Sequence, residues 1–411
     1  MFCVMLEPGP IATFRSDAPL FSIGFDADVR SRSSNHKMIY WSSIVICHIV
    51  ASVSAVFLED TDLVMAFIVH RHGDRTPTKS SVKYGTDPQA LIELTKPYGY
   101  GQLTEKGKRR AYDLGQHLRF RYDDLLGRQY NASDVYLRST DLTRTKMTML
   151  TALAAIYPPG RINWSDDINW TPVPYTTVPV KYDYNIAYLN CPAFINASDV
   201  IFGSFYPEFE RYNEALLAES VATGQDIVNH PIRAYDVSDI LDVQRSFGIP
   251  IPTYLEDLMP QIQAAAARAM DYIFEGENAN LEAGVLLQEF FKYANLAISG
   301  NQTERIRIYS AHDYNVYAFQ IVTQATPRQG VPKYASAYAL ELRRFKNTGQ
   351  FIVLPVYLPQ PGEQVIYQQI KGCGPLCDYN KFVQLNWSHG MNYCTWQHRC
   401  GFYKDFQVKE E

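Results

Sequence analysis

The chain has 411 residues, of which 46% are hydrophobic and 20% charged, a composition that excludes a disordered or fibrous protein. The length suffices for one large domain or two modest ones. The net charge of −5 and the lack of a basic block argue against a nucleic-acid partner and favour a small anionic ligand.

The N-terminal region predicts a targeting segment. Residues 1–37 show no helical or strand period, whereas residues 38–55 combine a short basic flank, an apolar centre and small residues at Val53 and Ala55. This pattern is typical of a secretory signal cleaved after about Ala55, with Met38 as the initiator and residues 1–37 as an extension that is not translated. A retained membrane anchor is the alternative, but the apolar run is short and broken by Ser and His. We expect no membrane span in the mature chain.

The apolar run Leu63–Val69 predicts a strand that is buried on both faces. It ends in Arg71-His72-Gly73-Asp74-Arg75-Thr76-Pro77, which places polar side chains at the carboxyl end of a sheet, where α/β folds bind ligands. Two guanidinium groups flanking an imidazole suit a phosphate dianion, because Arg forms planar forks to its oxygens. The imidazole could act as a nucleophile or as an acid or base. A merely solvated strand end is the alternative.

A second strand is expected further along the chain. Thr104 can cap a helix that runs from Glu105 to about Leu126 with its apolar stripe toward the core. Val135–Leu137 then predicts a strand, followed by a turn and a helix through Ala155. Arg138 lies at the end of this strand beside a helix N-terminus, which is a favourable place for a phosphate. Pairing with a carboxylate is the default alternative for such an Arg.

The middle of the chain is helical in pattern. From Asn190 to about Ile298, apolar spacing predicts helices near residues 206–220, 237–247, 253–274 and 281–297.

A third polar strand end follows at residues 305–314, where His312-Asp313 comes after alternating Ile residues. The structural interpretation is that Asp313 caps a helix beginning at Tyr314. The functional one is a proton donor for a departing oxygen. Residues 338–343 and 351–357 predict late strands that complete the sheet.

The heptapeptide Arg71–Pro77, the segment Arg138-Ser-Thr-Asp141 and the pair His312-Asp313 together resemble the motifs of the histidine acid phosphatase family. The resemblance implies an α/β fold with a mixed, mostly parallel sheet flanked by helices. It also implies that residues 56–189 and 299–411 form the α/β phosphatase domain, and that residues 190–298 form a smaller inserted helical domain.

The same resemblance implies hydrolysis of phosphate monoesters without cofactor or metal. His72 would be the nucleophile that forms a phosphohistidine, and Asp313 the proton donor. The residues that would bind the phosphate are Arg71, Arg75, Arg138 and His312. The substrate would be a small-molecule phosphomonoester, and the family suggests a homodimer.

Three alternatives stay open. The spacing His70-x-His72 imitates a metal-binding pair, which would suit a metallohydrolase. The chain could also be a secreted binding glycoprotein that has lost catalysis. Within the same enzyme class, phytase and lysophosphatidic acid phosphatase activities are both open.

Secretion, or delivery to a lysosome, would expose the chain to glycosylation and oxidation. Six sequons follow the signal, at Asn131, Asn163, Asn169, Asn196, Asn301 and Asn386. Cys373 and Cys377 can close a small loop, with zinc as the rival interpretation. The family resemblance suggests that Cys191 pairs with Cys394 or Cys400, and that one family disulfide is missing because Ala337 or a neighbour replaces its cysteine.

Overall fold

The computed structural model describes residues 58–160, 164–301, 304–374, 376–402 and 406–409. The expected extension at residues 1–37 and the expected signal at residues 38–55 lie outside this range. Residues Thr61–Glu411 form one compact unit.

The central sheet is mixed. Its strand order is β10-β7-β6-β1-β4-β2-β3, with β8 paired to β7. The strands are β1 Thr61–Arg71, β2 Val135–Thr140, β3 Thr176–Val178, β4 Ile306–Ala311, β6 Ala337–Phe345, β7 Phe351–Leu358, β8 Ile366–Tyr367 and β10 Cys377–Asp378. β1, β4, β2 and β3 are parallel neighbours, whereas β6, β7, β8 and β10 pair antiparallel. This confirms the predicted mixed α/β sheet and its strands.

Smaller elements complete the secondary structure. β5 (Ala325–Thr326) and β9 (Gln369–Ile370) form a separate two-stranded sheet. The α-helices are α2 Pro88–Thr95, α3 Glu105–Arg121, α4 Asp123–Leu126, α5 Thr143–Ile156, α6 Ala187–Asn190, α7 Pro192–Gly203, α8 Asn213–Thr223, α9 Ala234–Phe247, α10 Thr253–Asp257, α11 Met259–Ile273, α12 Glu277–Ile298, α13 Asp313–Val322, α14 Tyr379–Asn386 and α15 Tyr393–Arg399. Short 3-10 helices are η1 Val82–Tyr84, η2 Val180–Tyr182, η3 Tyr184–Ile186, η4 Pro207–Tyr212, η5 Pro231–Arg233 and η6 Trp387–His389.

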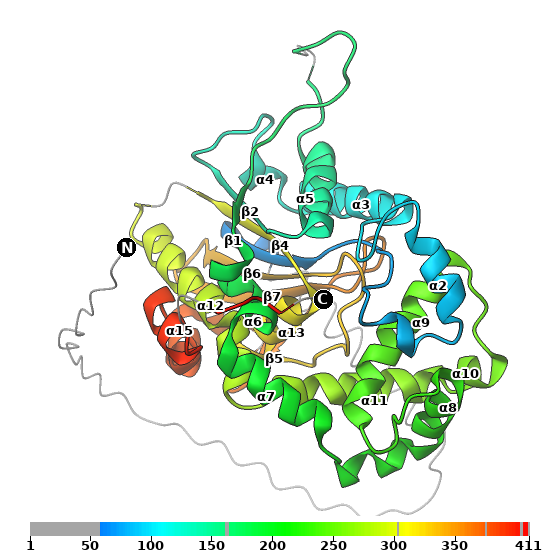
Figure 1. The fold of residues 1–411 in the computed structure, drawn as a ribbon. Helices are drawn as coiled ribbons and strands as arrows, with labels where there is room; N and C mark the ends of the chain where they lie inside the picture. Colours follow the sequence, from blue (N-terminus) through cyan, green and yellow to red (C-terminus); the bar gives the residue numbers. More distant parts are fainter. Residues whose placement is uncertain (1–57, 161–163, 302–303, 375, 403–405, 410–411) are drawn as a thin grey trace, which may run out of the picture. The chain divides into compact units, whose positions relative to one another are not determined.

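Helices cover both faces of the sheet (Figure 1). On one face, α5 packs against β2 and β4, and α3 packs against α5. On the other face, α12 and α13 cover β1: the ring of Phe67 lies 6.0 Å from that of Phe290 and 5.7 Å from that of Phe319, measured between centroids. β1 is therefore buried on both sides, as its apolar run predicts.

The helical domain is present as expected, with α7 to α11 lying beyond one end of the sheet (Figure 1). The single helix predicted for residues 253–274 is two helices, α10 and α11. Pro260 lies in the first turn of α11, where its missing N–H costs nothing. The last helix of the expected insert, α12, packs on the sheet.

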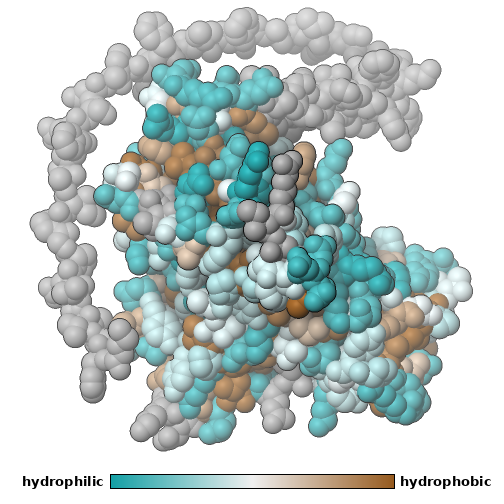
Figure 2. All heavy atoms as spheres, turned by 90° about the horizontal axis from the view of Figure 1, so that it is seen from above, coloured by the Kyte–Doolittle hydropathy of each residue, from teal (hydrophilic) through white to brown (hydrophobic). Residues whose placement is uncertain are grey.

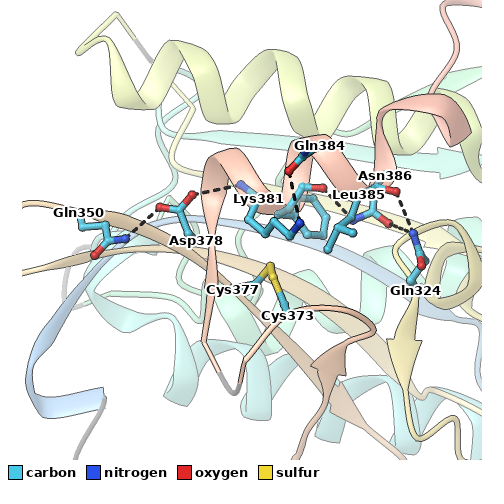
Figure 3. The surroundings of a disulfide bond; sticks show 10 residues. Gln324, Gln350, Cys373, Cys377, Asp378, Lys381, Gln384, Leu385 and Asn386 are labelled. Carbon is cyan, nitrogen blue, oxygen red and sulfur yellow. Dashed lines mark hydrogen bonds between the residues drawn. A yellow bond between two sulfur atoms is a disulfide. The ribbon is translucent and has the colours of Figure 1, made fainter. Parts of the chain in front are cut away.

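Both expected disulfides are present. Cys373 is joined to Cys377, and Figure 3 shows this bridge beside α14. Cys191 is joined to Cys400 rather than Cys394, across 209 residues of sequence, and ties the start of α7 to the C-terminal region.

One of the six sequons is buried. The Asn386 side chain is 0% exposed, its Nδ2 donates to the Phe382 carbonyl, and its Oδ1 accepts from Gln324 (Figure 3). A glycan on Asn386 does not fit this folded structure, so Asn386 is not among the surface sequons that could carry one. The side chains of Asn131, Asn169, Asn196 and Asn301 are exposed, and Asn163 lies outside the described range.

The surface in Figure 2 is largely hydrophilic, with separate hydrophobic patches. None of the helices in the described part of the chain combines the length and apolarity that a membrane crossing requires.

Candidate active site

The site is built at the ends of two neighbouring parallel strands. β1 and β4 pair with Arg71 opposite Ala311, so the next residues, His72 and His312, leave the sheet side by side. The His72 backbone N–H donates to the Ala311 carbonyl at 3.1 Å. The two imidazole rings lie 5.5 Å apart between centroids, edge to face. Two segments separated by about half the chain therefore meet because of strand register.

A cavity of about 280 Å³ opens at this point. Five of the six predicted site residues line it: Arg71, His72, Arg75, His312 and Asp313. The same wall contains Arg144 and Asp239, which sequence analysis did not single out.

The His72 ring is held in one orientation. Its Nδ1 lies 2.8 Å from the Gly73 carbonyl, which can only accept, so Nδ1 carries the proton and Nε2 keeps a lone pair. Burial first, and then the charges of Arg144 and Arg71, hold the pKa of His72 well below its ordinary value. The imidazole is thus neutral and suited to nucleophilic attack.

The rest of the heptapeptide fixes the loop that carries His72. A Cβ on Gly73 would lie 2.4 Å from the Gly107 carbonyl oxygen, so only glycine fits against the start of α3. The Gly73 N–H donates to Thr148 Oγ1 at 3.1 Å. Arg110 forms an ion pair with Asp74 at 2.5 Å. Gly73 and Asp74 therefore position the loop.

Arg71 and Arg75 share a carboxylate. Asp239, on α9, places Oδ1 2.8 Å from Arg71 Nη2 and Oδ2 2.7 Å from Arg75 Nη2. Arg71 also donates to the Pro332 carbonyl at 2.7 Å and lies 4.3 Å from the centre of the Tyr334 ring. Because Asp239 is 164 residues or more from both arginines in sequence, no local motif marks it.

Arg138 does not reach the cavity, and the predicted phosphate-binding role for this residue is not supported. Its Nη2 lies 2.6 Å from Asp183 Oδ1, and its guanidinium carbon lies 4.2 Å from the Tyr184 ring centre. The carboxylate pairing that the sequence left open is the arrangement observed, because β2 directs this side chain toward η3 rather than toward the strand end.

Arg144 lies where Arg138 was expected. It is in the first turn of α5, and its Nη2 lies 3.4 Å from His312 Nδ1. A cation in the first turn of a helix opposes the helix dipole and needs a compensating reason. That unfavourable placement, six residues after Arg138, is the signal that could have identified it.

Asp313 begins α13, one residue earlier than the expected start, and His312 is its N-cap. Asp313 Oδ2 lies 2.9 Å from Arg71 Nη2 and accepts from the Tyr235 hydroxyl at 3.0 Å. His312 Nε2 lies 3.0 Å from Thr140 Oγ1. Asp313 is thus the first residue of α13 rather than its cap, and it lines the cavity.

The predicted metal-binding alternative paired His70 with His72. His70 is fully buried, its Nδ1 contacts the Arg71 carbonyl at 3.1 Å, and burial lowers its pKa to about 4. His70 does not line the cavity. Within the described ranges, no group of three His, Cys, Asp or Glu residues has the geometry of a metal site.

The fold and the site define a histidine phosphatase. The model of the histidine phosphatase superfamily (branch 2) matches residues 62–218. Bovine prostatic acid phosphatase is 31% identical over 333 residues, covering 77% of this chain and 83% of that protein. Human lysosomal acid phosphatase is 28% identical, covering 84% and 83%, and honeybee venom acid phosphatase is 30% identical, covering 82% and 88%. The chain belongs to the histidine acid phosphatase family of phosphoric monoester hydrolases.

Solved structures agree on the fold. Phytase from Citrobacter braakii superposes with a TM-score of 0.59 at 14% identity, covering 81% of this chain and 99% of that one. Phytase from Hafnia alvei in complex with tartrate gives 0.58 at 16% identity, covering 82% and 98%.

Proposed function

We propose that this protein hydrolyses small phosphate monoesters through a phosphohistidine on His72. The observation that carries the proposal is the convergence of a neutral imidazole and three guanidinium groups, those of Arg71, Arg75 and Arg144, on one cavity. Catalysis of phosphoryl transfer depends mainly on positioning the phosphate and on placing fixed positive charge around its equatorial oxygens.

In the first step, His72 Nε2 attacks phosphorus in line with the leaving oxygen. The P–N bond forms as the P–O bond breaks, and Asp313 gives its proton to the departing alkoxide. The three arginines and His312 hold the phosphoryl oxygens. Because the pKa of His72 lies well below its ordinary value, the nucleophile stays neutral in mildly acid solution, and we expect activity to persist there.

In the second step, water attacks the phosphohistidine. The P–N bond breaks, the water proton passes to the Asp313 carboxylate, and inorganic phosphate is left in the site. This exchange restores both the neutral imidazole and the acid form of Asp313, so the cycle needs no further reagent.

The outer wall favours a monoester with a small apolar or aromatic leaving group. Tyr188, Phe194 and Phe202 line this part of the cavity. The carboxylates of Asp199 and Asp236 lie in the same wall, but each forms an ion pair with a Lys or Arg side chain that also lines the cavity, so they leave no net negative charge there. The apolar side chains lead us to expect turnover of aryl and simple alkyl phosphates, and comparing these substrates with phytate and lysophosphatidic acid tests the preference for the leaving group.

The deciding experiment compares His72→Ala with the wild-type protein on 4-nitrophenyl phosphate. We expect at least about a 10³-fold loss of phosphate release, because the covalent intermediate cannot form. His117→Ala, a half-buried His on α3 outside the cavity, is the matched control. Equal phosphate release by His72→Ala and wild type would refute the proposal, and an inactive wild type would favour a binding glycoprotein.

A chelator separates this mechanism from the metallohydrolase alternative. We expect wild-type activity to be unchanged after incubation with EDTA, and its abolition would revive the metal hypothesis.

The place of action is supported independently. The two disulfides suit a protein that folds in an oxidising compartment, and the relatives include a lysosomal and a venom phosphatase. We propose that the mature protein acts outside the cell or in lysosomes.

A further inference from the structure

Asp239 is the acidic residue from the helical domain that enters the arginine cluster. It lies on α9, is 9% exposed, and places one carboxylate oxygen on Arg71 and the other on Arg75, at 2.8 and 2.7 Å. One carboxylate thus links the two guanidinium groups of the heptapeptide.

This linkage offsets the charge repulsion between the two arginines. Arg71 and Arg75 are both buried and face the same cavity, so without a counter-charge they repel one another. Burial alone would raise the pKa of Asp239, but Arg75 and Arg71 hold it below its ordinary value. The carboxylate is therefore ionised and balances part of the positive charge.

A bound phosphate would lie against the same two guanidinium groups. Arg71 Nη1 is committed to the Pro332 carbonyl, and its Nη2 contacts both Asp239 and Asp313. A phosphate dianion in the cavity would compete with Asp239 for these N–H groups, and the two anions would also repel each other directly. Each occupant therefore weakens the hold of the site on the other.

We propose that Asp239 is a built-in counter-anion, a positioning residue that keeps Arg71 and Arg75 together in the free protein and limits the affinity of the site for inorganic phosphate. The inference rests on the proposed phosphatase function and extends it to product release. A site with three unopposed guanidinium groups would bind the product dianion tightly, whereas the Asp239 carboxylate favours its departure.

The test replaces Asp239 by Asn, which keeps the shape and removes the charge. Calorimetric titration with inorganic phosphate should show about tenfold tighter binding than in wild type, and the inhibition constant of phosphate should fall by the same factor. Asp242→Asn, less than one turn away on α9 and paired with Arg245 at 3.2 Å, is the control and should change neither value. Unchanged or weaker phosphate binding by Asp239→Asn would overturn the proposal.

Asp239→Glu restores the charge, and its phosphate affinity should return toward that of wild type. If Asp239→Asn is unstable alone, saturating phosphate should raise its melting temperature by more than it raises that of wild type, because the ligand supplies the missing counter-charge. A smaller rise would contradict the inference. Failure of the wild-type protein to bind phosphate or release it from a monoester would instead refute the proposed function.

Discussion

Two buried arginine–aspartate clusters in this protein have similar contacts and different surroundings. Arg138 pairs with Asp183 at 2.6 Å beneath the Tyr184 ring and away from the cavity. Arg71 and Arg75 share Asp239 at 2.8 and 2.7 Å and line the cavity. In the first cluster one arginine pairs with one carboxylate, whereas in the second cluster two arginines share one carboxylate.

The difference shows what makes a buried arginine a candidate ligand for phosphate. At Arg138 the charge is already balanced, so a dianion would gain little there and would have to enter a filled space. At the cavity, Arg144 adds a third guanidinium to the pair bridged by Asp239. Access and excess positive charge distinguish the binding cluster from the structural pair.

The largest expected effect concerns the second carboxylate on Arg71. Asp313→Asn keeps the hydrogen-bonding shape but cannot donate a proton to the leaving oxygen. We expect kcat to fall about 10²–10⁴-fold on an alkyl phosphate and much less on 4-nitrophenyl phosphate, whose leaving group needs no proton. Steady-state kinetics on both substrates measure this contrast. An equal loss on the two would show that Asp313 only holds Arg71.

The next prediction distinguishes Arg144, which lines the cavity, from Arg138, which does not. Arg144→Leu should lower kcat/KM about 10²–10³-fold with a small change in stability, because it removes a fixed charge from the phosphoryl oxygens. Kinetics and urea unfolding of the same preparation report both quantities.

Arg138→Leu should show the reverse. It leaves the buried Asp183 carboxylate without its counter-ion, so we expect a loss of about 3–5 kcal/mol in unfolding free energy. The protein that remains folded should keep its wild-type KM for 4-nitrophenyl phosphate. A raised KM for Arg138→Leu, together with normal kinetics for Arg144→Leu, would show that Arg138 binds the phosphate and that Arg144 does not.

The contrast also explains which parts of the site could be predicted from sequence. His72 and His312 follow apolar strand segments, and parallel pairing brings such ends together, so Arg71, Arg75 and Asp313 could be placed as well. Arg138 was expected at the phosphate site because its strand could be recognised from sequence. Recognising a strand does not determine toward which neighbouring element a side chain at its end points.

Asp239 could not be found in the same way. α9 is recognisable by its apolar spacing, but its contact with β1 depends on how the helical domain packs, which no local pattern records. The buried sequon at Asn386 has the same origin, since α14 hides a side chain that a tripeptide motif presents as available.

Another buried acidic side chain, that of Glu219 on α8, forms no ion pair with any residue in the described part of the chain. Neither of its carboxylate oxygens has a hydrogen-bond partner within the described part of the chain, and burial raises its pKa well above the ordinary value of 4.5. The folded protein therefore holds a proton that the unfolded chain releases. Stability should fall as the pH rises from about 4.5 through the raised pKa.

Glu219→Gln removes this dependence because the carboxamide is neutral at every pH. We expect the variant to match wild type at pH 4 and to be more stable by about 1–2 kcal/mol at pH 7.5, measured by urea unfolding. Glu214→Gln, at an exposed position on the same helix, should have no effect at either pH. A gain of equal size at both pH values would mean that Glu219 is already ionised in the fold. A buried carboxyl group without a partner would favour folding at acid pH, where it is protonated. The carboxylates of Asp183 and Asp239 differ from it because they are paired with arginines.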